Sequence, residues 1–103
     1  MKIKMVVERL SMDLKREITE HRIRNYDRIG LIEPAREDNN YRRFTDKDYA
    51  RLRTAILLSD SVGVSMEIVD MILNKKDKDA SKYAVRKAKQ NIKDNKNIID
   101  ILE

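Results

Sequence analysis

The chain contains no cysteine, no tryptophan, only two glycines and one proline, and a single histidine. Without cysteine it can form no disulfide, no thiolate metal site and no thiol redox switch. It also has no long apolar run, which excludes a membrane-spanning helix and a secretory signal peptide. We therefore expect a cytoplasmic protein that does not enter the membrane.

Groups suited to catalysis are equally sparse. His21 is the only histidine, no glycine-rich loop could hold a phosphate, and no pair of residues has catalytic spacing. A lone histidine of this kind is more often a surface residue than a metal ligand. The sequence thus predicts a protein that is not an enzyme and that uses no cofactor and no metal ion.

Charge, in contrast, is abundant. Charged residues make up 40% and hydrophobic residues 41% of the 103 residues, so the core can only be modest and oligomerisation would help stability. The net charge of +5 favours a polyanionic partner such as nucleic acid. Many soluble proteins are as basic, so the placement of the charges must decide.

Apolar residues recur at three- and four-residue spacing near the N-terminus. This spacing predicts a first helix over about Lys4–Lys15 and a second over about Glu20–Ile29. Thr19 can cap the second helix, and Gly30 suits the left-handed position just after it. The residues that this helix turns inward are Ile23, Tyr26 and Ile29. Its outer face carries basic and amide side chains, namely Arg22, Asn25 and Arg28.

A short hairpin is predicted next. Leu31-Ile32 and Tyr41–Phe44 read as its strands, and Asn39-Asn40 can turn the chain because asparagine tolerates positive φ. In the second strand, alternation separates Arg42 from Arg43 and leaves open which of the two faces is buried. These strands are too short to be a domain and form a wing instead.

Two further helices follow the wing. Thr45 and the acidic residues after it predict the start of a third helix over about Asp46–Asp60. Residues 61–64 turn the chain, and Ser65 caps a fourth helix over about Met66–Asn74. Both helices carry an apolar stripe on one face.

The last segment, about Ala80–Leu102, has a different period. Six of its residues follow the spacing of a coiled-coil seam, and Asn95 is the one large polar member. A narrow apolar seam on a charged helix needs a partner, and the same helix of a second chain is the simplest one. We therefore predict a long C-terminal dimerisation helix. Its seam residues are Val85, Ala88, Ile92, Asn95, Ile99 and Leu102.

The second helix and the wing could together hold DNA. Arginines supply donors for phosphates and base edges, and a basic hairpin beside a basic helix is what a winged helix-turn-helix uses to clamp the backbone. Each segment also has a simpler reading. In this interpretation the helix is an ordinary solvated surface with Glu20 and Asp27 as counter-charges. The hairpin is then a charged edge strand that resists aggregation.

Taken in order, these segments resemble the MerR family of bacterial transcription regulators. Arg22–Arg36 is similar to the recognition helix of that family and the Gly-Leu-Ile and Pro that follow it. Tyr41–Thr45 and Ala50–Leu52 continue the resemblance, and Val62–Glu67 is similar to the family's turn into its next helix. The similarity covers about Ile18 to Leu73, well over half of the chain.

Several departures from the family pattern stand out. Asn25 occupies the place of an aromatic residue, and Asn40 replaces a wing glycine, which its tolerance of positive φ permits. Residues 11–17 are longer than the family's first turn and lack its glycine. Family members usually carry an effector module or metal-binding cysteines after the dimer helix, so this chain resembles a short member that lacks an effector domain.

The resemblance implies two groups of DNA contacts. Those at the backbone or groove are Arg24, Tyr26, Tyr41 and Arg42. Those on the exposed front of the recognition helix, where base preference is set, are His21, Arg22 and Asn25. With other polar residues of the helix and wing, the expected DNA-binding set is Thr19, His21, Arg22, Arg24, Asn25, Tyr26, Arg28, Arg36, Tyr41, Arg42 and Arg43.

We predict a mainly α protein with a winged helix-turn-helix DNA-binding domain over residues 1–75 and a coiled-coil dimerisation helix over residues 76–103. Two copies would place two recognition helices in the major grooves of a pseudo-palindromic site. The resemblance implies a regulator that distorts a promoter, with RNA polymerase as a further partner. Two alternatives stay open: an architectural or excisionase-like DNA-bending protein, and a helical protein-interaction module, which leaves the wing without a role.

Overall fold

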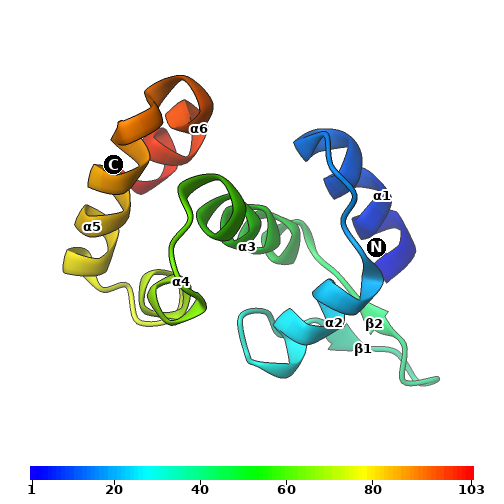
Figure 1. The fold of residues 1–103 in the computed structure, drawn as a ribbon. Coiled ribbons are helices and arrows are strands. Elements are labelled where there is room, and N and C mark those ends of the chain that lie inside the picture. The colour runs from blue at the N-terminus through cyan, green and yellow to red at the C-terminus, as the bar shows by residue number, and fades with distance from the viewer. The chain divides into compact units, whose positions relative to one another are not determined.

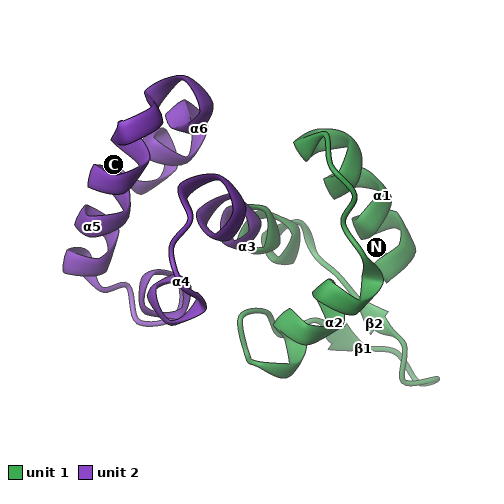
Figure 2. Ribbon diagram, viewed as in Figure 1, with its two compact units in different colours: residues 1–53 green, residues 54–103 purple.

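Helices form most of the chain, and one short hairpin is its only sheet (Figure 1). The computed structural model describes residues 1–103, which form two compact units, residues 1–53 and residues 54–103 (Figure 2). The predicted mainly α class, with a wing and a helical C-terminal part, is confirmed. No helix combines the length and the apolar character that a membrane crossing requires.

Unit 1 begins with α1 (Ile3–Leu14) and α2 (Glu20–Arg28), close to the predicted helices. Lys15 ends α1 in the left-handed region at φ 54°, a conformation more often taken by glycine. The hydroxyl of Ser11 accepts a hydrogen bond from the backbone N–H of Ile18 at 3.0 Å and closes the turn. Thr19 caps α2, since its Oγ1 accepts from the N–H of Arg22 at 3.2 Å.

The end of α2 is fixed by Gly30, which has φ 82°. The N–H of Gly30 donates to the carbonyl of Asp27 at 3.1 Å, and the N–H of Leu31 donates to the carbonyl of Tyr26 at 3.0 Å. This is a Schellman motif, in which Leu31 and Tyr26 are both buried. Ile29 was predicted to face inward and is exposed, because it lies beyond the last helical turn and no longer follows the buried stripe.

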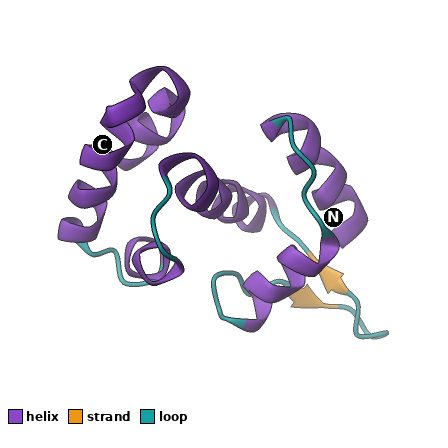
Figure 3. Ribbon diagram, viewed as in Figure 1, coloured by secondary structure: helices purple, strands orange, loops and turns teal.

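The wing consists of β1 (Ala35–Arg36) and β2 (Arg42–Arg43), paired antiparallel with Arg36 opposite Arg42 (Figure 3). The prediction that Leu31-Ile32 is the first strand is wrong. Both residues are buried, and pairing starts only after Pro34, which has no N–H for a ladder. The predicted turn is confirmed, because Asn40 adopts φ 67°.

Next, α3 (Asp46–Ile56) starts in unit 1 at a reciprocal cap. Thr45 Oγ1 accepts from the N–H of Asp48 at 3.1 Å, and Asp48 Oδ2 accepts from the N–H of Thr45 at 2.9 Å. From this helix, Arg51 Nε donates to the carbonyl of Leu31 at 2.9 Å, and Arg53 Nε lies 2.8 Å from Asp13 Oδ2 on α1. These contacts hold α3 against α1 and against the segment that follows α2. The buried apolar residues of unit 1 are Val6, Leu10, Ile18, Ile23, Tyr26, Leu31, Ile32, Phe44 and Leu52.

Unit 2 continues from α3 into a π-helical stretch, η1 (Leu57–Val62), so regular α-helix ends four residues before the predicted end at Asp60. Gly63 then turns the chain at φ 83°, and Ser65 caps α4 (Met66–Leu73) by accepting from the N–H of Ile68 at 3.3 Å. The remaining helices are α5 (Lys78–Ala88), the short 3-10 turn η2 (Lys89–Asn91) and α6 (Ile92–Leu102).

The prediction of one continuous C-terminal helix is therefore wrong. Asn91 leaves the helical region at φ −139° and caps α6, accepting from the N–H of Asp94 at 3.3 Å and donating to Asp94 Oδ2 at 2.7 Å. Asparagine favours such a cap over a helix interior because its side chain bonds the backbone of a new helix start. The chain breaks here, and α6 packs back against α5.

Candidate nucleic-acid interface

The positive charge is concentrated in unit 1. Residues 1–53 hold 14 of the 23 basic residues and 10 of the 18 acidic residues, so they carry +4 of the net charge of +5. Unit 2 carries the remaining +1. A polyanion is therefore drawn to the unit that contains α2 and the wing.

The predicted DNA-binding side chains of α2 differ in their exposure and in their partners. Arg24 is exposed, and its Nη2 lies 3.4 Å from Glu20 Oε1, a surface pair that is worth little and leaves the guanidinium open to a phosphate. His21 and Arg28 are exposed as well, and Arg28 donates a hydrogen bond to the Asn25 side chain. Asn25 thus lies half-buried beneath the arginine that follows it.

Arg22 and Tyr26 form a pair within the same helix. Arg22 Nε donates to the Tyr26 hydroxyl at 2.9 Å, and the guanidinium lies 5.6 Å from the centre of the ring. Tyr26 is buried in unit 1, with only 3% of its surface exposed. Tyr26 therefore supports Arg22 from below, and this contact holds the guanidinium in place on α2.

The wing shows which face of β2 is buried. Phe44 lies in the core and Arg42 is half-buried on the same side, while Tyr41 is 62% exposed and Arg43 is exposed on the other. Arg43 has no ion pair within the chain. Tyr41 and Arg43 are thus the wing residues most open to a DNA backbone.

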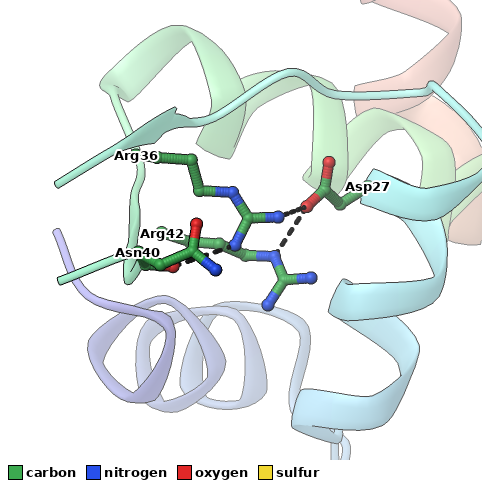
Figure 4. Close-up of polar contacts among 4 residues, drawn as sticks. All are labelled: Asp27, Arg36, Asn40 and Arg42. Carbon is green, nitrogen blue, oxygen red and sulfur yellow. Dashed lines mark hydrogen bonds and ion pairs between the residues drawn. The ribbon is translucent and has the colours of Figure 1, made fainter. Parts of the chain in front are cut away.

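Two wing arginines converge on one carboxylate of α2 (Figure 4). Asp27 Oδ2 lies 2.6 Å from Arg42 Nε and 3.0 Å from Arg36 Nη2. From the sequence alone, Asp27 was predicted only as a counter-charge on the helix. Its partners lie nine and fifteen residues further along the chain, and no sequence period indicates such a contact.

A hollow of about 300 Å³ joins α2 to the wing and to the start of α1. Lys2 and Lys4 line it together with Arg24, Tyr41 and Arg42. Sequence reasoning missed both lysines, because only the tertiary fold brings them here. Residue 1 is held beside the wing by two hydrogen bonds of 2.7 Å, one from its ammonium to the carbonyl of Phe44 and one from the Phe44 N–H to its own carbonyl.

The predicted dimerisation residues lie in unit 2 and are not equally exposed. Ala88, Asn95 and Ile99 are buried, Val85 and Leu102 are half-buried, and Ile92 is 58% exposed. Half of the predicted seam is therefore covered within a single chain. No group of three or more His, Asp or Glu side chains is placed to hold a metal ion.

Comparison with protein families gives a match to the MerR helix-turn-helix regulatory proteins over residues 1–76. The chain belongs to the MerR family. The matched residues run from α1 through the wing to the end of α4, and membership supports DNA binding and transcription regulation. Comparisons with curated proteins and with solved structures gave no match.

Proposed function

We propose that this MerR protein is a sequence-specific transcription regulator that binds a pseudo-palindromic promoter site as a homodimer and distorts it. Family membership supports the DNA-binding part. The observation that carries the proposal is the joint placement of α2 and the wing, whose exposed basic groups lie around one hollow and one shared carboxylate. A major groove admits an α-helix, and a basic hairpin held beside that helix can contact the DNA backbone next to the groove.

The expected contacts follow from the place of each side chain on α2 and the wing. The front of α2 would enter the major groove, with His21 and Asn25 facing base edges and Arg24 facing phosphates. In the wing, Tyr41 and Arg43 would contact the backbone, and Lys2 and Lys4 would add phosphate contacts from the start of α1.

For dimerisation we propose residues 76–103, after a DNA-binding domain over residues 1–75. The C-terminal helices leave several large apolar side chains at the surface, namely Tyr83, Ile92 and Ile101. Exposed apolar groups of this size on a charged hairpin favour a protein partner, and a second copy is the simplest one. Two copies would then span two half-sites of a palindrome, and RNA polymerase at the distorted promoter would be the further partner.

Selection of bound duplexes from a random DNA library tests this function. The proposal predicts an enriched sequence with two-fold symmetry, and sedimentation of the complex should give two chains per site. A library that returns no preferred sequence would favour an architectural DNA-bending protein instead. Enrichment of a single half-site with one chain bound would refute the dimer.

A further inference from the structure

The contact between α2 and the wing points to a role for an acidic residue in a basic interface. One oxygen of Asp27 accepts from guanidinium groups on both strands of the hairpin, Arg36 from β1 and Arg42 from β2 (Figure 4). The Asp27 side chain is only 17% exposed, so this pairing is less screened than a surface ion pair.

The same contact extends to the tip of the wing. Arg36 Nη1 donates to the carbonyl of Asn40 at 3.2 Å, while its Nη2 donates to Asp27. Asn40 is the turn residue with positive φ, so one guanidinium connects the recognition helix to the wing turn. Asp27 thereby fixes the direction of the hairpin relative to α2.

The negative charge of Asp27 also lowers the positive charge of the wing. Two guanidinium groups share one carboxylate, so the cluster keeps a charge of +1 instead of +2. Arg42 uses only its Nε for Asp27, and its two terminal nitrogens point away from the carboxylate (Figure 4). It can therefore bind a phosphate at one end while Asp27 holds it at the other.

We infer that Asp27 is a positioning and specificity-determining residue of the DNA interface. Its carboxylate aligns the wing for the correct site and weakens binding of the wing to DNA of any sequence. This inference rests on the proposed DNA-binding function. Without the carboxylate, two freed guanidinium groups strengthen contacts that carry no sequence information, and an unaligned wing fits the specific site less well.

The test compares Asp27→Asn with Asp38→Asn. Both remove one negative charge near the wing, but Asp38 is exposed in the turn and has no partner within the chain, so it is a matched control for net charge. Affinities for the selected duplex and for a scrambled duplex are measured over a range of salt concentrations. Asp27→Asn should bind the scrambled duplex about fivefold more tightly, with a salt slope steeper by about one, and its ratio of specific to non-specific affinity should fall about tenfold.

Asp38→Asn should strengthen binding to both duplexes alike and leave the ratio unchanged. Asp27→Glu, which keeps the charge, should keep a ratio near that of the wild type. Equal ratios for Asp27→Asn and Asp38→Asn would overturn the inference. So would a loss of binding by Asp27→Asn to both duplexes in equal measure, because that result indicates a purely structural role.

A second comparison uses arginines and needs no change at Asp27. Arg36→Gln removes a guanidinium whose two terminal nitrogens already bond Asn40 and Asp27, whereas Arg43→Gln removes an unpaired one. Arg43→Gln should lower the non-specific salt slope by about one and Arg36→Gln by clearly less. Equal reductions would contradict the inference.

Hydrogen exchange of the free protein separates this inference from the proposed function. Amides of residues 36–42 should exchange faster in Asp27→Asn than in Asp38→Asn, whether or not DNA binds. If the wild type binds no DNA, the proposed function fails while this measurement still decides whether Asp27 orders the wing. If DNA binds and wing exchange is the same in both variants, the positioning role fails alone.

Discussion

Asn95 Nδ2 donates a hydrogen bond to the carbonyl oxygen of Ala88, 3.1 Å away, across the turn that separates α5 from α6. Asn95 is only 3% exposed, and its Oδ1 is buried without a partner. The polar residue that the heptad spacing assigned to a seam between two chains therefore bonds to the end of α5 in its own chain. This amide connects α6 to the last residue of α5.

Asn95→Asp tests the importance of that hydrogen bond. The substitution keeps the size of the side chain but replaces the donor by a carboxylate that faces a carbonyl oxygen in a buried place. Unit 2 should lose about 3 kcal/mol of unfolding free energy at neutral pH, measured by urea denaturation. Part of the loss should be recovered at acid pH, where the protonated carboxyl group can donate. An unchanged stability at neutral pH would show that the amide contributes nothing.

Ile92→Asp tests the surface through which we propose that two chains pair. Ile92 is the seam residue that the hairpin leaves most exposed, so a charge there should disrupt a dimer without unfolding the chain. Sedimentation should show a shift toward monomer of at least tenfold in the dissociation constant, with unchanged helical circular dichroism. Gln90→Asp, which adds the same charge at an exposed site of the η2 turn, should leave the dimer intact. Equal effects of the two variants would argue against this surface.

Gly30→Ala tests the backbone at the end of α2. A Cβ at Gly30 would meet no atom within 4 Å, so the only cost is the left-handed φ of 82°. Thermal or urea unfolding should show a loss of about 1 kcal/mol, and Gly30→Asn should lose less because asparagine adopts this region more readily. A loss of several kcal/mol in both variants would indicate a steric role that the fold does not predict.

Alkaline pH should weaken the contact between α1 and α3. Burial raises the pKa of the Tyr49 hydroxyl above its usual value of 10.0, and the nearby Asp13 charge, to which the hydroxyl donates at 3.3 Å, raises it further. A raised pKa in the folded state means that this contribution to stability is complete below about pH 10 and is lost as the pH rises through the folded pKa. The unfolding free energy should therefore fall more between pH 9 and pH 11 in the wild type than in Tyr49→Phe. The same fall in both proteins would exclude Tyr49 as its source.

Much of unit 1 could be predicted because local chemistry determines it. The cap at Thr19, the left-handed Gly30 and the positive φ of Asn40 all follow from the preferences of single residues, as does the cap at Ser65 in unit 2, and the structure confirms each. The helices of that unit follow from apolar spacing. Family membership, predicted from the order of the motifs, is confirmed by the match over residues 1–76.

The features that could not be predicted from the sequence depend on contacts between residues distant in the chain. The pairing of Asp27 with both wing arginines needs the tertiary placement of three segments. Lys2 and Lys4 line the hollow beside α2 and the wing, next to residue 1, which pairs with Phe44. The break at Asn91 was missed for another reason. A heptad period shows which residues share a helix face, but it does not show where a capping residue interrupts the helix.

The central claim is that α2 and the wing read a specific DNA sequence, and a fluorescence anisotropy titration tests it most directly. The selected duplex and a scrambled duplex are titrated at several salt concentrations with the wild type, Arg24→Ala and Lys75→Ala, which removes an exposed lysine of unit 2. The wild type should bind the selected duplex at least about 1,000-fold more tightly, with a steep loss of affinity as salt rises. Arg24→Ala should weaken binding to both duplexes and lower the salt slope by about one, while Lys75→Ala should match the wild type. Equal affinity of the wild type for both duplexes, or an affinity that salt does not change, would contradict the claim.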